Sequence, residues 1–466
     1  MFWEVYALDR QEYLKSLTEQ IRTKRARTMV AEEVEAHIED QKQDFMAHGL
    51  GEEEAESMAV VEMGDPVEAG VKLDRVHRPK MEWTVLMAIL VISIMGLILQ
   101  AVVTSSFPTM NMSTLEAFKD NFLYGGIWSA MLIGIAVMLG ICYLDYSILV
   151  KWSFPIWAVM QIPAVFSIVS KIFFDETMWI GPMVNGRSVV QMLLSYLVIP
   201  FYAGTIYHFR RKGTKGLIIS TVCLGISVLT DLMIPFMSSA VVTGITGLVL
   251  LHVAVCKGWF GENKKKFLIR ICLILMSGIT FWGNGRFVTD YQVHRLEALI
   301  TGEHWDYTRG AVADVANTAK DQNSSKWHES QSSGKIEVTD PYNGATEVEA
   351  VTLYNYARND YIWTYLFHYF GNVKGVFLVV VFAVFMALLL RMAVKQKNRL
   401  GYMLSIGCVI FLILQSLFYI GVNAGLYPIS GNYMPFLSHG NMTMMITYFY
   451  MGILLSVYRN SNIVKN

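Results

Sequence analysis

Long apolar stretches recur through most of this chain, and they restrict its fold more than any other feature. A transmembrane helix needs about 20 consecutive, mostly apolar residues to cross about 30 Å of hydrocarbon. With 54% hydrophobic and only 16% charged residues, the chain is also too apolar for an ordinary soluble protein, which carries roughly 25% charge. We therefore predict an all-α, polytopic membrane protein. About ten transmembrane helices are expected, at 83–104, 122–143, 147–171, 189–208, 216–234, 237–256, 267–283, 370–391, 400–423 and 440–458.

The Lys and Arg residues near the ends of these stretches predict their orientation, because cytoplasmic loops carry an excess of both. With a cytoplasmic N-terminus, 15 such residues fall on the cytoplasmic side: Lys151, Arg210, Arg211, Lys212, Lys215, Lys257, Lys264, Lys265, Lys266, Arg391, Lys395, Lys397, Arg399, Arg459 and Lys465. Four fall on the other side: Lys119, Lys171, Arg187 and Lys374. We therefore expect both termini in the cytoplasm and one large extracytoplasmic loop, residues 284–360.

The first 80 residues have a different composition, with 18 acidic and 11 basic side chains. Leu14, Leu17 and Ile21 recur at helical spacing, and Asp65 followed by Pro66 is typical of a helix start. We predict a small cytoplasmic helical domain, residues 1–80, ahead of a membrane domain, residues 81–466. Because the whole chain has equal numbers of basic and acidic residues, 38 of each, a basic nucleic-acid-binding protein is excluded.

The segment 32–66 resembles the helical prefix domain found ahead of some Firmicute membrane proteins and permeases. The matching residues are Glu33, His37, Gly51, Glu54, Ala55, Gly64, Asp65 and Pro66. The resemblance implies an interaction or regulatory module with an unidentified cytoplasmic partner. Glu33 and His37 lie one helical turn apart, but two ligands without a third are weak evidence for a metal site.

Three features place polar or irregular backbone groups at the membrane. Residues 425–440 are rich in Gly and Pro, which indicates a re-entrant segment with non-helical backbone; such backbone is tolerated at membrane depth where it lines a cavity. Asp231 lies inside a predicted span, and Asp360 ends the external loop. Ionisable residues in membrane spans are candidates for function, although each acid could equally be a helix cap or a hydrogen-bonded interfacial group.

The order of these features resembles the SEDS family (shape, elongation, division, sporulation), which includes FtsW, RodA and SpoVE. The Gly/Pro-rich segment is similar to the family's signature loop at Gly425, Pro428, Gly431, Pro435, Phe436, Ser438 and Gly440. Residues 359–363 resemble the family's T-D-F-I-F element, and 229–232 resemble its P-D-L element with Thr230 in place of Pro. Gln191 resembles a residue at the loop before span four, and Arg295 one that opens the external loop. The resemblance covers roughly residues 85–460.

The resemblance implies a glycosyltransferase that polymerises lipid II into peptidoglycan strands at the outer face of the bacterial cytoplasmic membrane. It places the general base on Asp360, which would deprotonate the acceptor hydroxyl. Candidate substrate-binding residues are Arg295, Arg358, Gln191, Pro428, Gly431, Pro435, Ser438 and Gly440, and Asp231 is an intramembrane polar residue. A divalent cation could assist the pyrophosphate leaving group. The expected partners are lipid II, membrane lipid and a class B penicillin-binding protein.

Some family positions differ in this chain. The G-E-E run after the aspartate is replaced by Phe367-His368-Tyr369, and the G-G-S-S run of the signature loop is replaced by residues 440–443, Gly-Asn-Met-Thr. A non-catalytic scaffold or regulator of cell-wall synthesis that keeps the SEDS fold is therefore the main alternative. A lipid flippase or solute transporter with Asp231 in its pathway is the third hypothesis.

Overall fold

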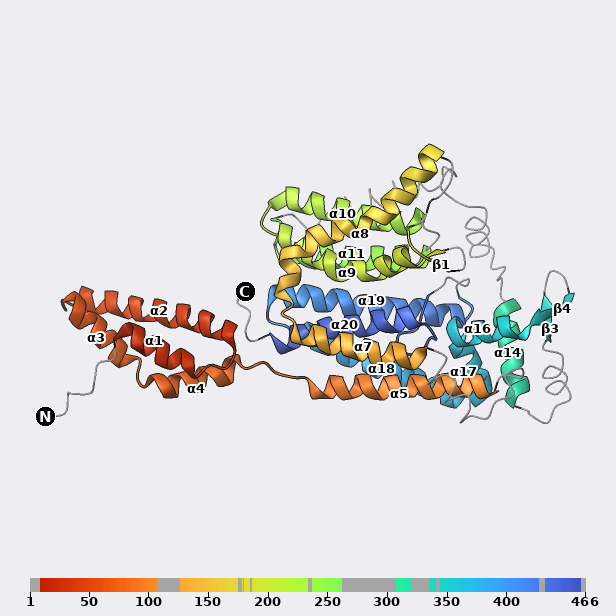
Figure 1. Cartoon of the computed structure of the whole chain (residues 1–466), viewed down its shortest axis with the longest axis horizontal. Helices are drawn as coiled ribbons and strands as arrows, with labels where there is room; N and C mark the ends of the chain where they lie inside the picture. The colour runs from red at the N-terminus through yellow and green to blue at the C-terminus, as the bar shows by residue number, and fades with distance from the viewer. Residues whose placement is uncertain are drawn as a thin grey trace. The chain divides into compact units, whose positions relative to one another are not determined.

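The computed structural model describes residues 9–106, 126–174, 178, 180–184, 187–233, 237–261, 307–320, 335–340, 344–426 and 432–461 (Figure 1). The chain folds into two compact units. One consists of Met1–Met81 with Tyr458–Asn466, and the other is Glu82–Val457. The first unit is a small helical domain, whereas the second contains the long apolar helices and the external segments.

Four helices form the N-terminal unit: α1 (Arg10–Glu19), α2 (Lys24–Ala47), α3 (Glu52–Glu62) and α4 (Pro66–His77). The predicted apolar stripe of α1 is confirmed, because Leu17 and Ile21 are fully buried and Leu14 packs against the same core. The predicted start of α4 is also confirmed. The Asp65 side chain accepts a hydrogen bond from the Val67 amide at 2.9 Å, with proline at the first helical position.

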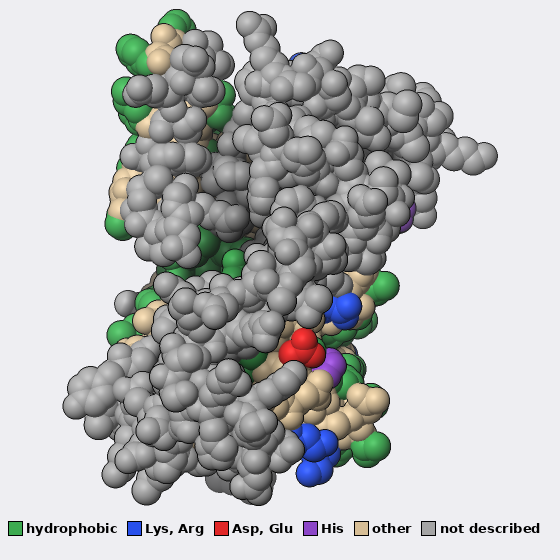
Figure 2. Space-filling view, turned by 90° about the vertical axis from the view of Figure 1, so that its right-hand side faces the viewer, with side chains coloured by type: hydrophobic (Ala, Val, Ile, Leu, Met, Phe, Trp, Pro, Cys, Tyr) green, Lys and Arg blue, Asp and Glu red, His purple; other side chains and the backbone are tan. Residues whose placement is uncertain are grey.

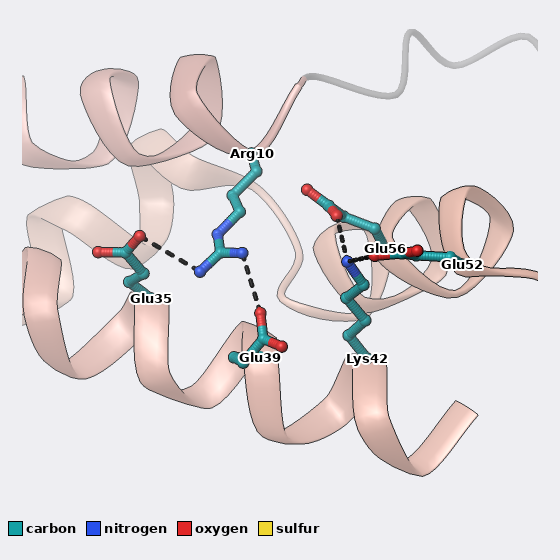
Figure 3. Close-up of polar contacts among 6 residues, drawn as sticks. All are labelled: Arg10, Glu35, Glu39, Lys42, Glu52 and Glu56. Carbon is teal, nitrogen blue, oxygen red and sulfur yellow. Dashed lines mark hydrogen bonds and ion pairs between the residues drawn. The ribbon is translucent and has the colours of Figure 1, made fainter. Parts of the chain in front are cut away.

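Charged side chains join α2 to its neighbours within this unit (Figure 3). The Lys42 ammonium group lies 3.1 Å from Glu52 and 2.8 Å from Glu56 on α3. The hydrogen bonds that Lys42 donates to Glu56 and Glu52 raise the pKa of Lys42, and the bond to Glu56 lowers the pKa of Glu56. On α1, Arg10 contacts both Glu35 and Glu39 of α2. These pairs link α1 and α3 to the acidic helix α2.

The second unit is a bundle of long helices lying side by side (Figure 1). They are α5 (Trp83–Ser106), α7 (Ile127–Tyr143), α8 (Ser147–Phe174), α9 (Val189–Phe209), α10 (Gly213–Met233), α11 (Met237–Cys256), α18 (Asn372–Val394), α19 (Arg399–Asn423) and α20 (Asn441–Arg459). Each coincides with one of the predicted stretches. In the described part of the chain, seven helices are long and apolar enough to cross a membrane: α5, α8, α9, α10, α11, α18 and α19. The predicted stretch 267–283 lies outside the described residues.

Apolar side chains on the outside of the bundle support a lipid-facing surface. On α18, Val373 is 85% exposed, and Phe377 and Val380 follow it along the helix with more than half of their surface exposed. By contrast, α19 is the most enclosed of the seven candidate spans. Because large exposed apolar patches are rare on soluble monomers, this distribution indicates that α18 faces lipid and α19 forms the centre of the bundle.

The fold is all-α apart from two small antiparallel hairpins that sequence analysis did not predict. Strand β1 (Met183–Val184) pairs with β2 (Arg187–Ser188), and β3 (Lys335–Asp340) pairs with β4 (Gly344–Glu349). The second hairpin has the register Lys335↔Glu349. Its first strand alternates apolar and polar residues, Ile336 and Val338 among them, which is the strand period of two. Such a short alternating segment contains no long apolar run, so apolar length does not reveal it.

Three helices lie in, or directly after, the segment that we predicted as the external loop, and they lead back to the bundle. They are α14 (Tyr307–Lys320), α16 (Ala350–Asn359) and α17 (Ile362–Phe370), and α17 is followed directly by α18. Helices α14 and α17 pack together, and α16 packs on both α17 and α5. The break between α16 and α17 is therefore fixed against the bundle, and it contains Asp360.

Removing the Ile38 side chain should destabilise the N-terminal unit. Ile38 is fully buried in the core of this unit, so Ile38→Ala leaves a cavity that costs about 2–5 kcal/mol of unfolding free energy. Hydrogen–deuterium exchange of the full chain should show faster exchange in α1 and α2. Val61 on α3 is 50% exposed, and Val61→Ala should stay within about 0.5 kcal/mol of wild type. Equal exchange in both variants would contradict the burial of Ile38.

Candidate functional site

Asp360 lies in the short break between α16 and α17. Its backbone amide donates to the Tyr356 carbonyl at 3.0 Å, and the next amide, of Tyr361, donates to the same carbonyl at 2.9 Å. Tyr361 is fully buried, whereas Asp360 is half-buried. The carboxylate therefore sits on a hydrogen-bonded turn, and part of the residue stays accessible.

Two side chains of α19 hold this turn. The Tyr419 hydroxyl donates to the Asn359 carbonyl at 2.6 Å and accepts from the Ile362 amide at 3.1 Å. The Asn423 amide nitrogen donates to the Asp360 carbonyl at 2.9 Å, and its oxygen accepts from the Thr364 amide at 2.9 Å. Each bond satisfies a backbone group that the interruption of the helix frees. The most enclosed helix of the bundle thus positions the Asp360 backbone on both sides.

The Gly/Pro-rich loop between α19 and α20 contacts the same turn through Ser438. The Ser438 hydroxyl donates to the Asn359 carbonyl at 3.0 Å and accepts from the Met434 amide at 2.8 Å. Pro435 is buried within this loop. Gly440 follows, and a side chain there would meet Thr443 at the start of α20. Residues 79 positions apart in the sequence therefore meet in one hydrogen-bonded cluster.

A close approach of α5 to this loop fixes its path. A Cβ added to Gly96 would collide with the Phe436 carbonyl oxygen. Phe436 itself has φ +65°, a left-handed conformation that costs a non-glycine residue energy. Its ring packs edge-on against Phe385 and Tyr448, with centroids 5.8 and 5.4 Å apart. These contacts keep the loop in this conformation, so that Ser438 reaches the Asp360 turn.

Arg358 places a positive charge two residues before Asp360. Its guanidinium group donates to the Tyr354 hydroxyl at 2.7 Å and also contacts the His439 imidazole. Its carbonyl accepts from the His439 amide at 3.0 Å and from Gln100 of α5 at 2.9 Å. Burial, followed by the charge of Arg358, lowers the pKa of His439 to about 3. At neutral pH the imidazole is therefore uncharged, and the positive charge of the pair resides on Arg358.

Figure 2 looks onto the end of the membrane unit at which these external helices lie. Among the described residues of this face, acidic surface (red) and histidine surface (purple) adjoin each other. Ionisable groups are therefore accessible side by side at this end.

Gln191 and Asp231 lie in a second place, a pocket between α8, α9 and α10. Its described lining residues are Met160, Gln161, Ala164, Gln191, Leu194, Ser195, Val198, Ser227, Thr230 and Asp231. Asp231 is only 3% exposed and accepts a hydrogen bond from Ser239 at 3.1 Å. The Gln191 amide nitrogen donates to the Pro163 carbonyl and the Ser167 hydroxyl. We predicted Gln191 as a substrate contact, but its side chain faces this pocket and α8.

The structure thus gathers part of the predicted set in one place. Asp360, Arg358, Ser438, Pro435 and Gly440 belong to the cluster at the α16–α17 break. Three other predicted residues lie outside the described residues: Arg295, Pro428 and Gly431. The described residues contain no group of three or more His, Cys, Asp or Glu side chains that could hold a metal ion. The predicted divalent cation therefore stays a prediction.

Sequence reasoning missed the residues that hold the turn. These are Gln100 on α5, Tyr419 and Asn423 on α19, and Tyr354 and His439 beside Arg358. Gln100 and Asn423 are amides near the ends of otherwise apolar helices. Polar side chains at such places usually form hydrogen bonds with backbone groups of another segment. The bilayer interior contains no water that could bond those backbone groups instead. That signal could have identified both residues.

Curated proteins with similar sequences match parts of this chain. Probable peptidoglycan glycosyltransferase FtsW of Thioalkalivibrio sp. (strain K90mix) is 32% identical over 110 residues, 23% of this chain and 28% of the relative. Stage V sporulation protein E of Bacillus subtilis (strain 168) is 29% identical over 104 residues, 22% of this chain and 28% of the relative. FtsW of Francisella salina is 26% identical over 286 residues, 60% of this chain and 65% of the relative. The first two matches each span 28% of the relative's length.

A solved structure shares the fold of the chain. It comes from work described as "Structural coordination of polymerization and crosslinking by a peptidoglycan synthase complex", with a TM-score of 0.57 and 15% sequence identity. The match covers 82% of this chain and 98% of that chain. Together with the apolar helices, it shows a multi-pass membrane protein. Residues 82–463 match the family described as "Cell cycle protein, FTSW_RODA_SPOVE". This match covers most of the sequence, and the chain belongs to the FtsW/RodA/SpoVE family, the SEDS proteins.

Proposed function

We propose that this protein is a peptidoglycan glycosyltransferase that polymerises lipid II, with Asp360 as the general base. The main support for this proposal is that Tyr419, Asn423 and Ser438 form hydrogen bonds with the Asp360 turn. Five hydrogen bonds from these three side chains fix the backbone of a half-buried carboxylate. A base must be held in place while it takes a proton, because small displacements of catalytic groups reduce rates severely.

The proposed reaction is a direct displacement at the donor sugar. The 4-hydroxyl oxygen of the acceptor sugar forms a bond to the anomeric carbon of the donor, and that carbon is inverted. The bond from this carbon to the polyprenyl pyrophosphate oxygen breaks, and the hydroxyl proton moves to Asp360. General base catalysis of this kind contributes about 10²–10⁴-fold. Arg358 lies two residues before Asp360 in the sequence and is bonded to Tyr354 and His439, and its positive charge would stabilise the departing pyrophosphate.

The proposal extends to location and partners. The distribution of Lys and Arg predicts that both termini lie in the cytoplasm. The α16–α17 break would then face the outer leaflet of the bacterial cytoplasmic membrane, where lipid II is exposed. The similar solved chain is described as part of a complex that coordinates polymerization and crosslinking. A class B penicillin-binding protein would supply crosslinking here. The N-terminal unit is proposed to bind a cytoplasmic partner through its acidic surface.

The altered family positions favour a non-catalytic scaffold as the second candidate function. His368 does not reach toward Asp360, because its Nδ1 atom bonds the Thr364 carbonyl of its own helix at 2.8 Å and its side chain is exposed. Phe367 packs on Gly375 of α18. These side chains therefore add no acid or base beside Asp360, and a scaffold would need only the intact turn. A transporter is less favoured, since Asp231 is enclosed within the bundle.

Replacing Asp360 distinguishes the enzyme from the scaffold. Asp360→Asn keeps the size of the side chain and removes the base, so polymerisation of lipid II by the purified chain with its partner should fall by at least about 10²-fold. Asp314, exposed on α14 of the same external region, gives the matched control Asp314→Asn, which should keep full activity. In cells, Asp360→Asn should fail to replace the wild-type gene at normal expression. Normal growth and normal polymerisation with Asp360→Asn would favour the scaffold.

Removing the Ser438 hydroxyl should impair catalysis more than folding. Ser438→Ala loses the bond to the Asn359 carbonyl, and a lost buried hydrogen bond costs about 1–3 kcal/mol. Because this bond positions Asp360, its loss should raise the activation free energy, so that kcat drops by about 10-fold with little change in KM. Ser416→Ala removes a buried hydroxyl that bonds only the Leu412 carbonyl of its own helix, and it should leave kcat unchanged. Equal kcat in both variants would contradict the positioning role of Ser438.

A further inference from the structure

The pocket between α8, α9 and α10 combines a buried acid with unused hydrogen-bond acceptors. Asp231 lies two residues before the end of α10, and Gln191 lies in the first turn of α9. Because α9 and α10 are consecutive helices joined by a short turn at their other ends, these two positions lie at the same end of the helix pair. Both side chains line the pocket, and both are at least 97% buried.

Three of the side chains that line this pocket have their donors already used. Both described bonds of the Gln191 amide nitrogen go to α8, to the Pro163 carbonyl at 2.9 Å and the Ser167 hydroxyl at 2.8 Å. The Ser227 hydroxyl donates to the Cys223 carbonyl. The Thr230 hydroxyl donates to the Ser227 carbonyl and the Gln161 side-chain oxygen. No donor on these three side chains therefore remains for a ligand.

The hydrogen-bond acceptors that line the pocket are used less completely than these donors. The Gln191 side-chain oxygen is buried and has no hydrogen-bond partner. The Asp231 carboxylate accepts from Ser239 at 3.1 Å, and the Ser195 and Thr243 side chains also interact with it. A carboxylate has about four acceptor positions, so it keeps room for a further contact. None of the ten described lining residues is Lys, Arg or His. A buried carboxylate without a positive counter-charge is costly.

We propose that this pocket binds a monovalent alkali cation, coordinated by the Asp231 carboxylate and the side-chain oxygens of Gln191 and Gln161. All-oxygen ligand sets select hard cations, and one carboxylate balances one positive charge. A cation would satisfy the orphaned Gln191 oxygen and neutralise Asp231 together. A water molecule would supply hydrogens to the acceptors and leave the negative charge uncompensated. The site is separate from the Asp360 turn, and the proposal does not depend on the glycosyltransferase reaction.

The test is the dependence of thermal unfolding on the cation, with the full chain purified in detergent. The unfolding midpoint is measured in NaCl, KCl and N-methylglucamine chloride at one ionic strength. Binding to the folded state alone should raise the midpoint saturably, by at least about 2 °C, with Na⁺ or K⁺ but not with the bulky organic cation. The midpoint of Asp231→Asn should not depend on the cation. Equal midpoints of the wild type in all three salts would overturn the proposal.

Two further variants locate the effect and keep the test valid if Asp231→Asn does not fold. Gln191→Met keeps the length of the side chain and removes the amide oxygen, so about 10-fold more cation should be needed for half of the shift. Asp360→Asn lies outside the pocket and should keep the full wild-type shift, which separates this site from any cation at the α16–α17 break. A shift that is unchanged in Gln191→Met, or lost in Asp360→Asn, would overturn the assignment to this pocket.

Discussion

The site depends on one physical constraint, the need to bond the backbone groups that a helix break exposes at the edge of the membrane. Between α16 and α17 the chain stops and restarts its helical hydrogen bonding within three residues. The freed groups of Asn359, Asp360 and Ile362 are bonded by Tyr419, Asn423 and Ser438. Because unpaired backbone groups are costly where water is excluded, these three side chains make the break stable and thereby fix the direction of Asp360.

That bonding requires α5, α19 and the 432–440 loop to approach one another closely. Gly96 allows the Phe436 carbonyl to lie against α5, as small residues commonly do where membrane helices pack. Gln100, one turn further along α5, then bonds the carbonyls of both Arg358 and Leu437. A single helix face therefore contacts the external helix and the signature loop together. Displacing α5 would affect Arg358 and Ser438 at the same time.

The sequence predicted the bundle well and the site in part, for physical reasons. Apolar length alone marks a membrane helix, so the predicted stretches 189–208 and 400–423 lie within one residue of α9 and α19. The contact between Ser438 and Asn359 joins residues 79 positions apart, and no local pattern specifies such a contact. The family resemblance placed Ser438 and Asp360 in one site. It could not show that Gln191 turns toward α8, because that depends on how Pro163 exposes its carbonyl.

The two membrane-associated acids differ in surroundings, and this difference assigns them different chemistry. Asp360 is half-buried on an external turn, with Arg358 two residues away. Under the proposed function it would meet a sugar hydroxyl carried on a lipid. Asp231 is enclosed by three helices among hydroxyl and amide groups. Its low exposure leaves no room for a bulky lipid-linked sugar, and the ligand proposed there is a bare ion. We therefore assign the proposed proton transfer from a large substrate to the α16–α17 break, and the proposed cation to the pocket of α8, α9 and α10.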